Sequence, residues 1–163
     1  MRFPMTLGVA AKVVTALVAL LIVVLFVLPG REGVARFLLP LLVTIVLAVT
    51  VLWAPRAVRL ESDALVLERL AWFDLRIPFT DMVSVERGPT LGVFGAGLLR
   101  VAGNGGLMGF TGFFWLPRVG LVRLWATQLG TTTVLIRRSA GRPIVLGVDD
   151  GAGLERALRH RLG

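Results

Sequence analysis

Two long runs of apolar residues dominate the first third of the chain. The first run, VVTALVALLIVVLFVL, begins directly after Lys12, and the second lies between Arg36 and Arg56. A helix needs about 20 predominantly apolar residues to cross a bilayer. The two runs therefore predict membrane-spanning helices over about residues 8–28 and 37–55.

A short connector rich in turn-forming residues separates the two runs. Its sequence, PGREG over residues 29–33, favours a tight turn. Two antiparallel spans joined by such a turn make a helical hairpin, which we predict over residues 1–55. A cleaved signal peptide is the alternative for the first run, but no small-residue cleavage pattern follows Leu28 and a second apolar run comes directly after it.

Basic and aromatic residues mark the predicted ends of the spans. Lys12, Arg36, Trp53 and Arg56 are expected at the membrane interface, where long cationic side chains and indoles place their polar ends in the head-group region. Basic residues near the spans are Arg2, Lys12, Arg56 and Arg59 on the terminal side, against Arg31 and Arg36 in the connector. The positive-inside rule then predicts that both termini are cytoplasmic.

After Pro55 the hydrophobic pattern changes to the short period of β-strands. It predicts strands in AVRLES (57–62), ALVLERL (64–70), LRIPF (75–79), DMVSVER (81–87), VGLVRLWAT (119–127), TTTVLIRR (131–138) and RPIVLGV (142–148). The last two are expected to form a hairpin around Ser139-Ala140-Gly141. The glycine-rich segment at 103–112 is interpreted as a loop or bulged segment, because glycine permits backbone conformations that other residues avoid.

The last segment of the chain is the only part of this region with a helical pattern. Leu154, Leu158 and Leu162 recur every four residues, and either Asp149 or Asp150 can cap the first turn. We therefore expect a helix over 150–162. Residues 56–163 as a whole predict a mainly β domain of about seven antiparallel strands, in a bent sheet or partly open barrel that this helix covers.

Four segments of this domain resemble the bacterial pleckstrin-homology (PH)-like domain family. They are RIPFTDMVSVE at 76–86, GNGGLMGF at 103–110, LVRLWAT at 121–127 and IVLGVDD at 144–150. Many members of that family carry one or two membrane spans ahead of the domain. The resemblance implies a seven-stranded, strongly bent sheet, a C-terminal helix and no catalytic residues. The chain departs from the family at Gly151, where proline often follows the paired aspartates.

Composition agrees with a membrane protein and excludes several classes of protein. Of the 163 residues 56% are hydrophobic and 17% are charged, whereas soluble domains average about 45–50% and about 25%. The absence of cysteine excludes disulfides and thiolate metal sites. The formal net charge of +8 favours contact with anionic partners.

Catalytic and cofactor chemistry has little support in the sequence. In the glycine-rich segment Met108 stands where the third glycine of a GxGxxG motif belongs, and no Gly-Lys-Ser/Thr follows. His160 lies on the polar face of the predicted helix, and helix capping accounts for Asp149 and Asp150. Asp63 and Asp81 are interpreted as residues of turns and strand ends. We therefore predict no catalytic residue, no cofactor and no metal site.

Arginine is the remaining chemical signal, since 17 of the 18 basic residues are arginines. Arg137, Arg138 and Arg142 flank the predicted hairpin turn, and Arg118 and Arg123 bracket another strand. Guanidinium groups suit phosphate, so the first three are candidate contacts for anionic lipid head groups. A solvated arginine-rich face is the alternative.

The surroundings of these arginines restrict the choice of anionic partner. The resemblance argues against specific inositol-lipid recognition, because the acidic turn Glu61-Ser62-Asp63 stands where PH domains that bind such lipids carry basic residues. The basic residues are also dispersed along the chain and no recognition motif accompanies them, which argues against nucleic acid.

These observations lead to one functional hypothesis and two alternatives. The hypothesis is a PH-like domain on the cytoplasmic face of the bacterial inner membrane that binds a protein partner, itself or a lipid surface without catalysis. An accessory subunit of a transporter or envelope complex is the first alternative, since Ala10, Ala11, Ala16 and Ala19 would permit close helix contacts. A membrane-associated enzyme is the second, with Asp149, Asp150 and His160 as its candidate residues.

Overall fold

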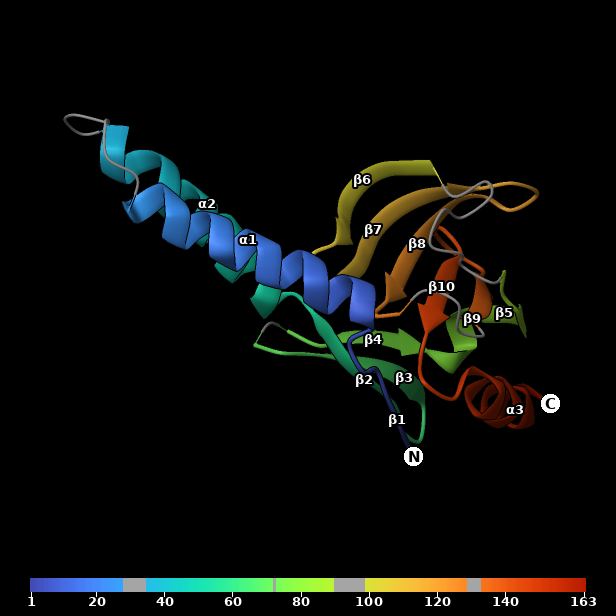
Figure 1. Cartoon of the computed structure of the whole chain (residues 1–163). Helices are drawn as coiled ribbons and strands as arrows, with labels where there is room; N and C mark the ends of the chain where they lie inside the picture. The colour runs from blue at the N-terminus through green and yellow to red at the C-terminus, as the bar shows by residue number, and fades with distance from the viewer. Residues whose placement is uncertain (28–34, 72, 90–98, 129–132) are drawn as a thin grey trace.

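The computed structural model describes residues 1–27, 35–71, 73–89, 99–128 and 133–163. In these segments an N-terminal apolar helix precedes a mainly β domain with two sheets and a C-terminal helix (Figure 1). The predicted order of apolar segments, strands and terminal helix is therefore confirmed.

Two apolar helices, α1 (Val9–Val27) and α2 (Ala35–Leu52), lie side by side and extend away from the β-domain (Figure 1). Helix α1 is long and apolar enough to cross a membrane, and nearly all of its surface is exposed. The described apolar part of α2, Phe37–Leu52, is shorter. Helix α2 ends before the predicted residue 55 because Pro55 begins a strand, and the residue before a proline avoids helical conformation.

The first sheet contains a strand that the sequence pattern does not predict. Its order is β1 (Arg2–Pro4), β2 (Pro55–Leu60), β3 (Ala64–Arg69) and β4 (Leu75–Pro78), and all neighbours are antiparallel. Strand β1 precedes α1, whereas β2 follows α2. Thus the first residues, which fall within the predicted hairpin segment 1–55, contribute a strand to the β-domain.

The second sheet has the order β5-β9-β10-β8-β7-β6. Its strands are β5 (Met82–Arg87), β6 (Leu99–Gly106), β7 (Gly109–Leu116), β8 (Gly120–Ala126), β9 (Thr133–Arg138) and β10 (Ile144–Gly147). The hairpin of β9 and β10 around residues 139–141 is confirmed. All seven predicted strands are present, as β2 to β5 and β8 to β10, but the described residues also form β1, β6 and β7, so the predicted number is too low. The prediction that all strands are antiparallel is wrong, since β10 runs parallel to β8 and antiparallel to its hairpin partner β9.

Apolar side chains from both sheets and from helix α3 (Gly151–Leu162) form the main core cluster. Asp150 caps α3 as predicted, since its Oδ1 accepts the N–H of Gly153 at 2.8 Å. Leu162, predicted to continue the apolar stripe of this helix, is exposed. The largest fully buried members of the cluster are Leu65, Leu67, Ile77, Ile136, Ile144, Leu146, Leu154 and Leu158.

The glycine-rich segment is a hairpin of two long strands, β6 and β7, whereas a loop or bulged segment was expected. Gly103 and Gly112 are opposite each other in this hairpin, with φ of +122° and +136°. A Cβ atom on either residue would lie 2.3 Å from a backbone oxygen of the other strand. Only glycine allows the two backbones to approach this closely.

We predict that Gly112→Ala destabilises the β-domain. The new Cβ would collide with the carbonyl oxygen of Ala102, and a positive φ alone costs a non-glycine residue about 1–2 kcal/mol. In a chain of this size that cost lowers the thermal midpoint by at least about 2–4 °C. Near-ultraviolet circular dichroism of the full chain in detergent measures this midpoint.

Gly105→Ala on β6 is the matched control. Its Cβ would meet only the tip of the flexible Arg100 side chain, at 3.1 Å. Equal losses in the two variants would contradict the explanation by backbone approach.

Candidate functional site

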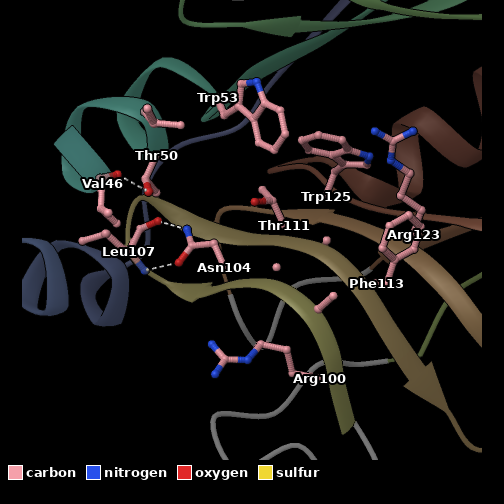
Figure 2. Close-up of a pocket in the computed structure, with 14 residues that line it drawn as sticks. Val46, Thr50, Trp53, Arg100, Asn104, Leu107, Thr111, Phe113, Arg123 and Trp125 are labelled. Carbon is pink, nitrogen blue, oxygen red and sulfur yellow. Dashed lines mark hydrogen bonds between the residues drawn. The ribbon is translucent and has the colours of Figure 1, made fainter. Parts of the chain in front are cut away.

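A cavity of about 530 Å³ lies between the last two turns of α2 and the strands β6, β7 and β8 (Figure 2). Val46, Val49 and Trp53 supply the wall on α2. The backbone of the close-approaching glycines of β6 and β7 and the ring of Phe113 supply much of the opposite wall. Most of the lining is therefore apolar, and it reaches the helical part of the molecule.

The polar end of this cavity is built around Trp125 of β8. Figure 2 shows the Trp125 indole beside the Arg123 side chain, at the end of the cavity away from Val46. The guanidinium carbons of Arg69 and Arg123 lie 4.8 Å and 5.1 Å from the centre of the indole ring. Two cations thus contact one buried aromatic ring in cation–π geometry.

Two nitrogen donors in this cluster have no hydrogen-bond partner within the described part of the chain. They are Nε1 of Trp125 and Nε of Arg69, and both atoms are buried. Trp125 as a whole is only 3% exposed. Indole and guanidinium groups donate and cannot accept, and an unpaired buried donor costs about 1–3 kcal/mol. These two nitrogens therefore lack a hydrogen-bond acceptor among the described residues.

Burial and mutual repulsion also affect the charge of the two arginines. Burial lowers the pKa of Arg69 and the positive charge of Arg123 lowers it further, whereas the nearby carboxylate of Asp74 raises it. Burial likewise lowers the pKa of Arg123, with a smaller contribution from Arg138. Both guanidinium groups nevertheless stay charged, as arginine does throughout the physiological range. An anion placed here would relieve the repulsion.

Hydrogen bonds hold the β6–β7 turn together and attach it to helix α1. The Asn104 side chain accepts the N–H of Leu107 at 3.2 Å and donates to the carbonyl of Leu107. The next N–H, that of Met108, donates to Oγ1 of Thr15 in α1 at 3.1 Å. This bond holds the tip of the hairpin against the second turn of α1.

The three arginines selected from the sequence do not form a free cationic patch. Arg137 pairs with Glu86 at 3.1 Å, and Arg138 makes a two-pronged bond to Asp81. The Arg142 guanidinium lies 4.9 Å from the ring centre of Phe113, whose side chain lines the cavity. The clustering of arginines in the sequence pointed to these residues. It gave no indication of Glu86 and Asp81, which neutralise Arg137 and Arg138.

Three of the four predicted interface residues lie near the junction of the helices and the β-domain. Trp53 lines the cavity, Lys12 is exposed in the first turn of α1, and Arg56 is exposed on β2. The side chain of Arg36 lies outside the described residues. Their predicted contact with the membrane interface stays a prediction.

The carboxylates considered as catalytic candidates have structural bonding partners. Asp149 accepts the backbone N–H of Thr6 at 3.0 Å and also bonds the Thr6 hydroxyl and the Gln128 amide. Asp150 caps α3, and His160 is exposed on the same helix. No group of three or more metal-ligating side chains occurs among the described residues.

Asp81 has a larger role than the turn residue expected from the sequence. Its carboxylate accepts from Oγ of Ser139 at 2.7 Å, from Arg138 and from the N–H of Ala140 at 3.2 Å. These bonds, that of Ser139 first and that of Arg138 second, lower the pKa of Asp81. The carboxylate thereby holds the β9–β10 turn against the start of β5.

We predict that Asp81→Asn destabilises the β-domain at neutral pH but loses this effect in acid. Because the folded protein lowers the pKa of Asp81, its stabilising contribution is complete above the unfolded pKa of about 3.9. It disappears as the pH falls through the lower, folded-state pKa. Thermal midpoints of wild type and variant, measured across this pH range in detergent, should therefore converge at acid pH.

Asp74→Asn is the charge-matched control for this experiment. Oδ1 of Asp74 accepts the backbone N–H of Arg69 at 3.2 Å, a bond that asparagine can keep. A difference between wild type and Asp81→Asn that stays constant down to the lowest pH would refute the assignment.

Searches against protein-family models, curated proteins and solved structures gave no match to this chain. The resemblance to PH-like domains therefore rests on the four sequence segments within residues 56–163 alone.

Proposed function

We propose that this protein is a membrane-anchored, non-catalytic binding module whose PH-like β-domain lies against the lipid surface. In this proposal α1 and α2 cross the bacterial inner membrane as a hairpin, and both termini are cytoplasmic. The β-domain binds the anionic surface of the inner leaflet.

The pairing of β1 with β2 is the observation that carries the hairpin proposal. Strand β1 precedes α1 and β2 follows α2, yet Phe3 is opposite Val58 in one antiparallel ladder. Two strands of one sheet must lie on the same side of a membrane. If α1 crosses the bilayer, the chain has to cross back before β2, and α2 is the apolar helix available for it.

The lengths of the helices suit this arrangement. At 1.5 Å per residue, the 19 residues of α1 span about 28 Å and the 18 residues of α2 about 27 Å. The hydrocarbon core of a bilayer is about 30 Å thick. Nearly the whole length of each helix is needed to cross it.

The β6–β7 hairpin would then meet the bilayer surface. Its tip is bonded to Thr15 of α1, six residues or about 9 Å along the helix from Val9. Since α1 needs nearly its whole length to cross, the tip would enter the shallow part of the hydrocarbon region. Residues 88–117 carry a single charge, Arg100, and Leu99 and Val101 on β6 are largely exposed. Such a surface suits the boundary between head groups and acyl chains.

Labelling of single cysteines tests the proposed topology, and the chain has no cysteine of its own. In one variant Glu32→Cys reports on the connector, and in another Ser62→Cys reports on the exposed β2–β3 turn. A membrane-impermeant maleimide should label position 32 in intact bacteria. It should label position 62 only after the inner membrane is opened.

Alkaline carbonate extraction of the same cells provides the control for membrane insertion, and the wild-type chain should remain in the pellet. Labelling of both cysteines from the same side would contradict the hairpin. Release of the chain by carbonate would contradict membrane insertion as a whole.

A further inference from the structure

The cavity under α2 combines an apolar wall with a cationic end that has no acceptor. Val46 and Val49 line the part on α2, whereas Arg123 and Trp125 lie at the other end (Figure 2). Among the described residues no carboxylate forms an ion pair with the guanidinium of Arg123. Asp74, by contrast, accepts the backbone N–H of Arg69, which does not line the cavity. A cation that lines the cavity without a counter-ion calls for an anion that accepts hydrogen bonds.

The direction of the cavity restricts the occupant further. Val46 lies one to two helical turns farther from the β-domain than Thr50 and Trp53, so the lining becomes apolar along α2 toward the bilayer. An inorganic anion would fill only the cationic end. An amphiphile with an anionic head and a hydrocarbon chain matches both ends, and a volume of about 530 Å³ is in the range of small-molecule sites.

We propose that this cavity binds an anionic phospholipid of the surrounding membrane. Its phosphate accepts from the Arg123 guanidinium beside the Trp125 ring, and one acyl chain lies along Val49 and Val46 of α2. The inference rests on the proposed function, because the lipid enters from the bilayer that α2 crosses. It assigns to the module a single bound lipid, in addition to contact with the membrane surface.

The test uses the full chain in nanodiscs that contain equal amounts of phosphatidylglycerol and phosphatidylcholine. Native mass spectrometry after transfer to detergent counts the lipids that each chain retains. We expect wild type to retain one phosphatidylglycerol. Arg123→Gln should retain about tenfold less, since a hydrogen bond to a charged group is lost.

Two further variants make the result specific to the cavity. Val49→Trp fills the wall on α2 without a change of charge and should also displace the lipid, so it decides the question if Arg123→Gln does not fold. Arg118→Gln removes an exposed charge in the turn after β7 and should retain phosphatidylglycerol like wild type. Thermal midpoints of all variants identify those that have lost the fold.

Equal retention of phosphatidylcholine by wild type, or undiminished phosphatidylglycerol in folded Arg123→Gln and Val49→Trp, would overturn the lipid site. Carbonate extraction separates this failure from that of the proposed function. A wild-type chain that stays in the membrane but retains no phosphatidylglycerol contradicts only the lipid site. A chain that carbonate releases contradicts membrane anchoring itself.

Discussion

The pairing of the first residues of the chain with β2 is the constraint on which the arrangement of the whole molecule depends. Phe3 and Met5 are buried in the main core, and the N–H of Met5 donates to the carbonyl of Arg56 at 2.9 Å. Gly8 then bonds Thr127 at the end of β8, and Asp149 bonds Thr6. The segment before α1 is thus attached to both sheets, so α1 has to begin beside β8. The cavity exists because the helices are held at this place.

The glycines of β6 and β7 make the second contribution to the cavity. Side chains at Gly103 and Gly112 would separate the two strands, and a side chain at Gly106 would point toward Val14 of α1. Because Gly103 and Gly112 lack side chains, the two strands can approach each other closely and present backbone to the cavity. The same substitution that destabilises the hairpin would therefore also alter the site. Stability and binding cannot be separated at these positions.

The sequence predicts those helices and strands whose hydrophobic pattern lies within one short segment of the chain. The apolar runs identified α1 and most of α2, alternation identified β9 and β10, and leucine spacing with Asp150 identified α3. It did not predict β1, since three residues carry no periodicity, or β6 and β7, since glycine at every second or third position hides the alternation. The parallel contact of β8 with β10 depends on a partner far along the chain. Of the candidate site, the alternation within β8 is enough to place Arg123 on the same face as Trp125, although the sequence prediction did not draw that conclusion. The contact of Arg69 with this ring depends on the position of β3, which no local pattern indicates.

The distribution of carboxylates decides which arginines remain for an anionic ligand. Of the ten acidic residues, nine are described, and Glu32 lies outside the described residues. Six of the nine pair with arginines of the first sheet, of β9 or of α3: Glu61, Asp63, Glu68, Asp81, Glu86 and Glu155. The other three, Asp74, Asp149 and Asp150, accept backbone N–H groups.

Among the described residues no carboxylate therefore forms an ion pair with Arg100 or Arg123, the two arginines that line the cavity next to α2. The overall charge of +8 understates this asymmetry, because it averages a largely neutralised face with an uncompensated one. Surface ion pairs contribute little to stability. Their effect here is on where unpaired cations remain: the arginines without a carboxylate partner lie where an anionic leaflet would meet the β-domain.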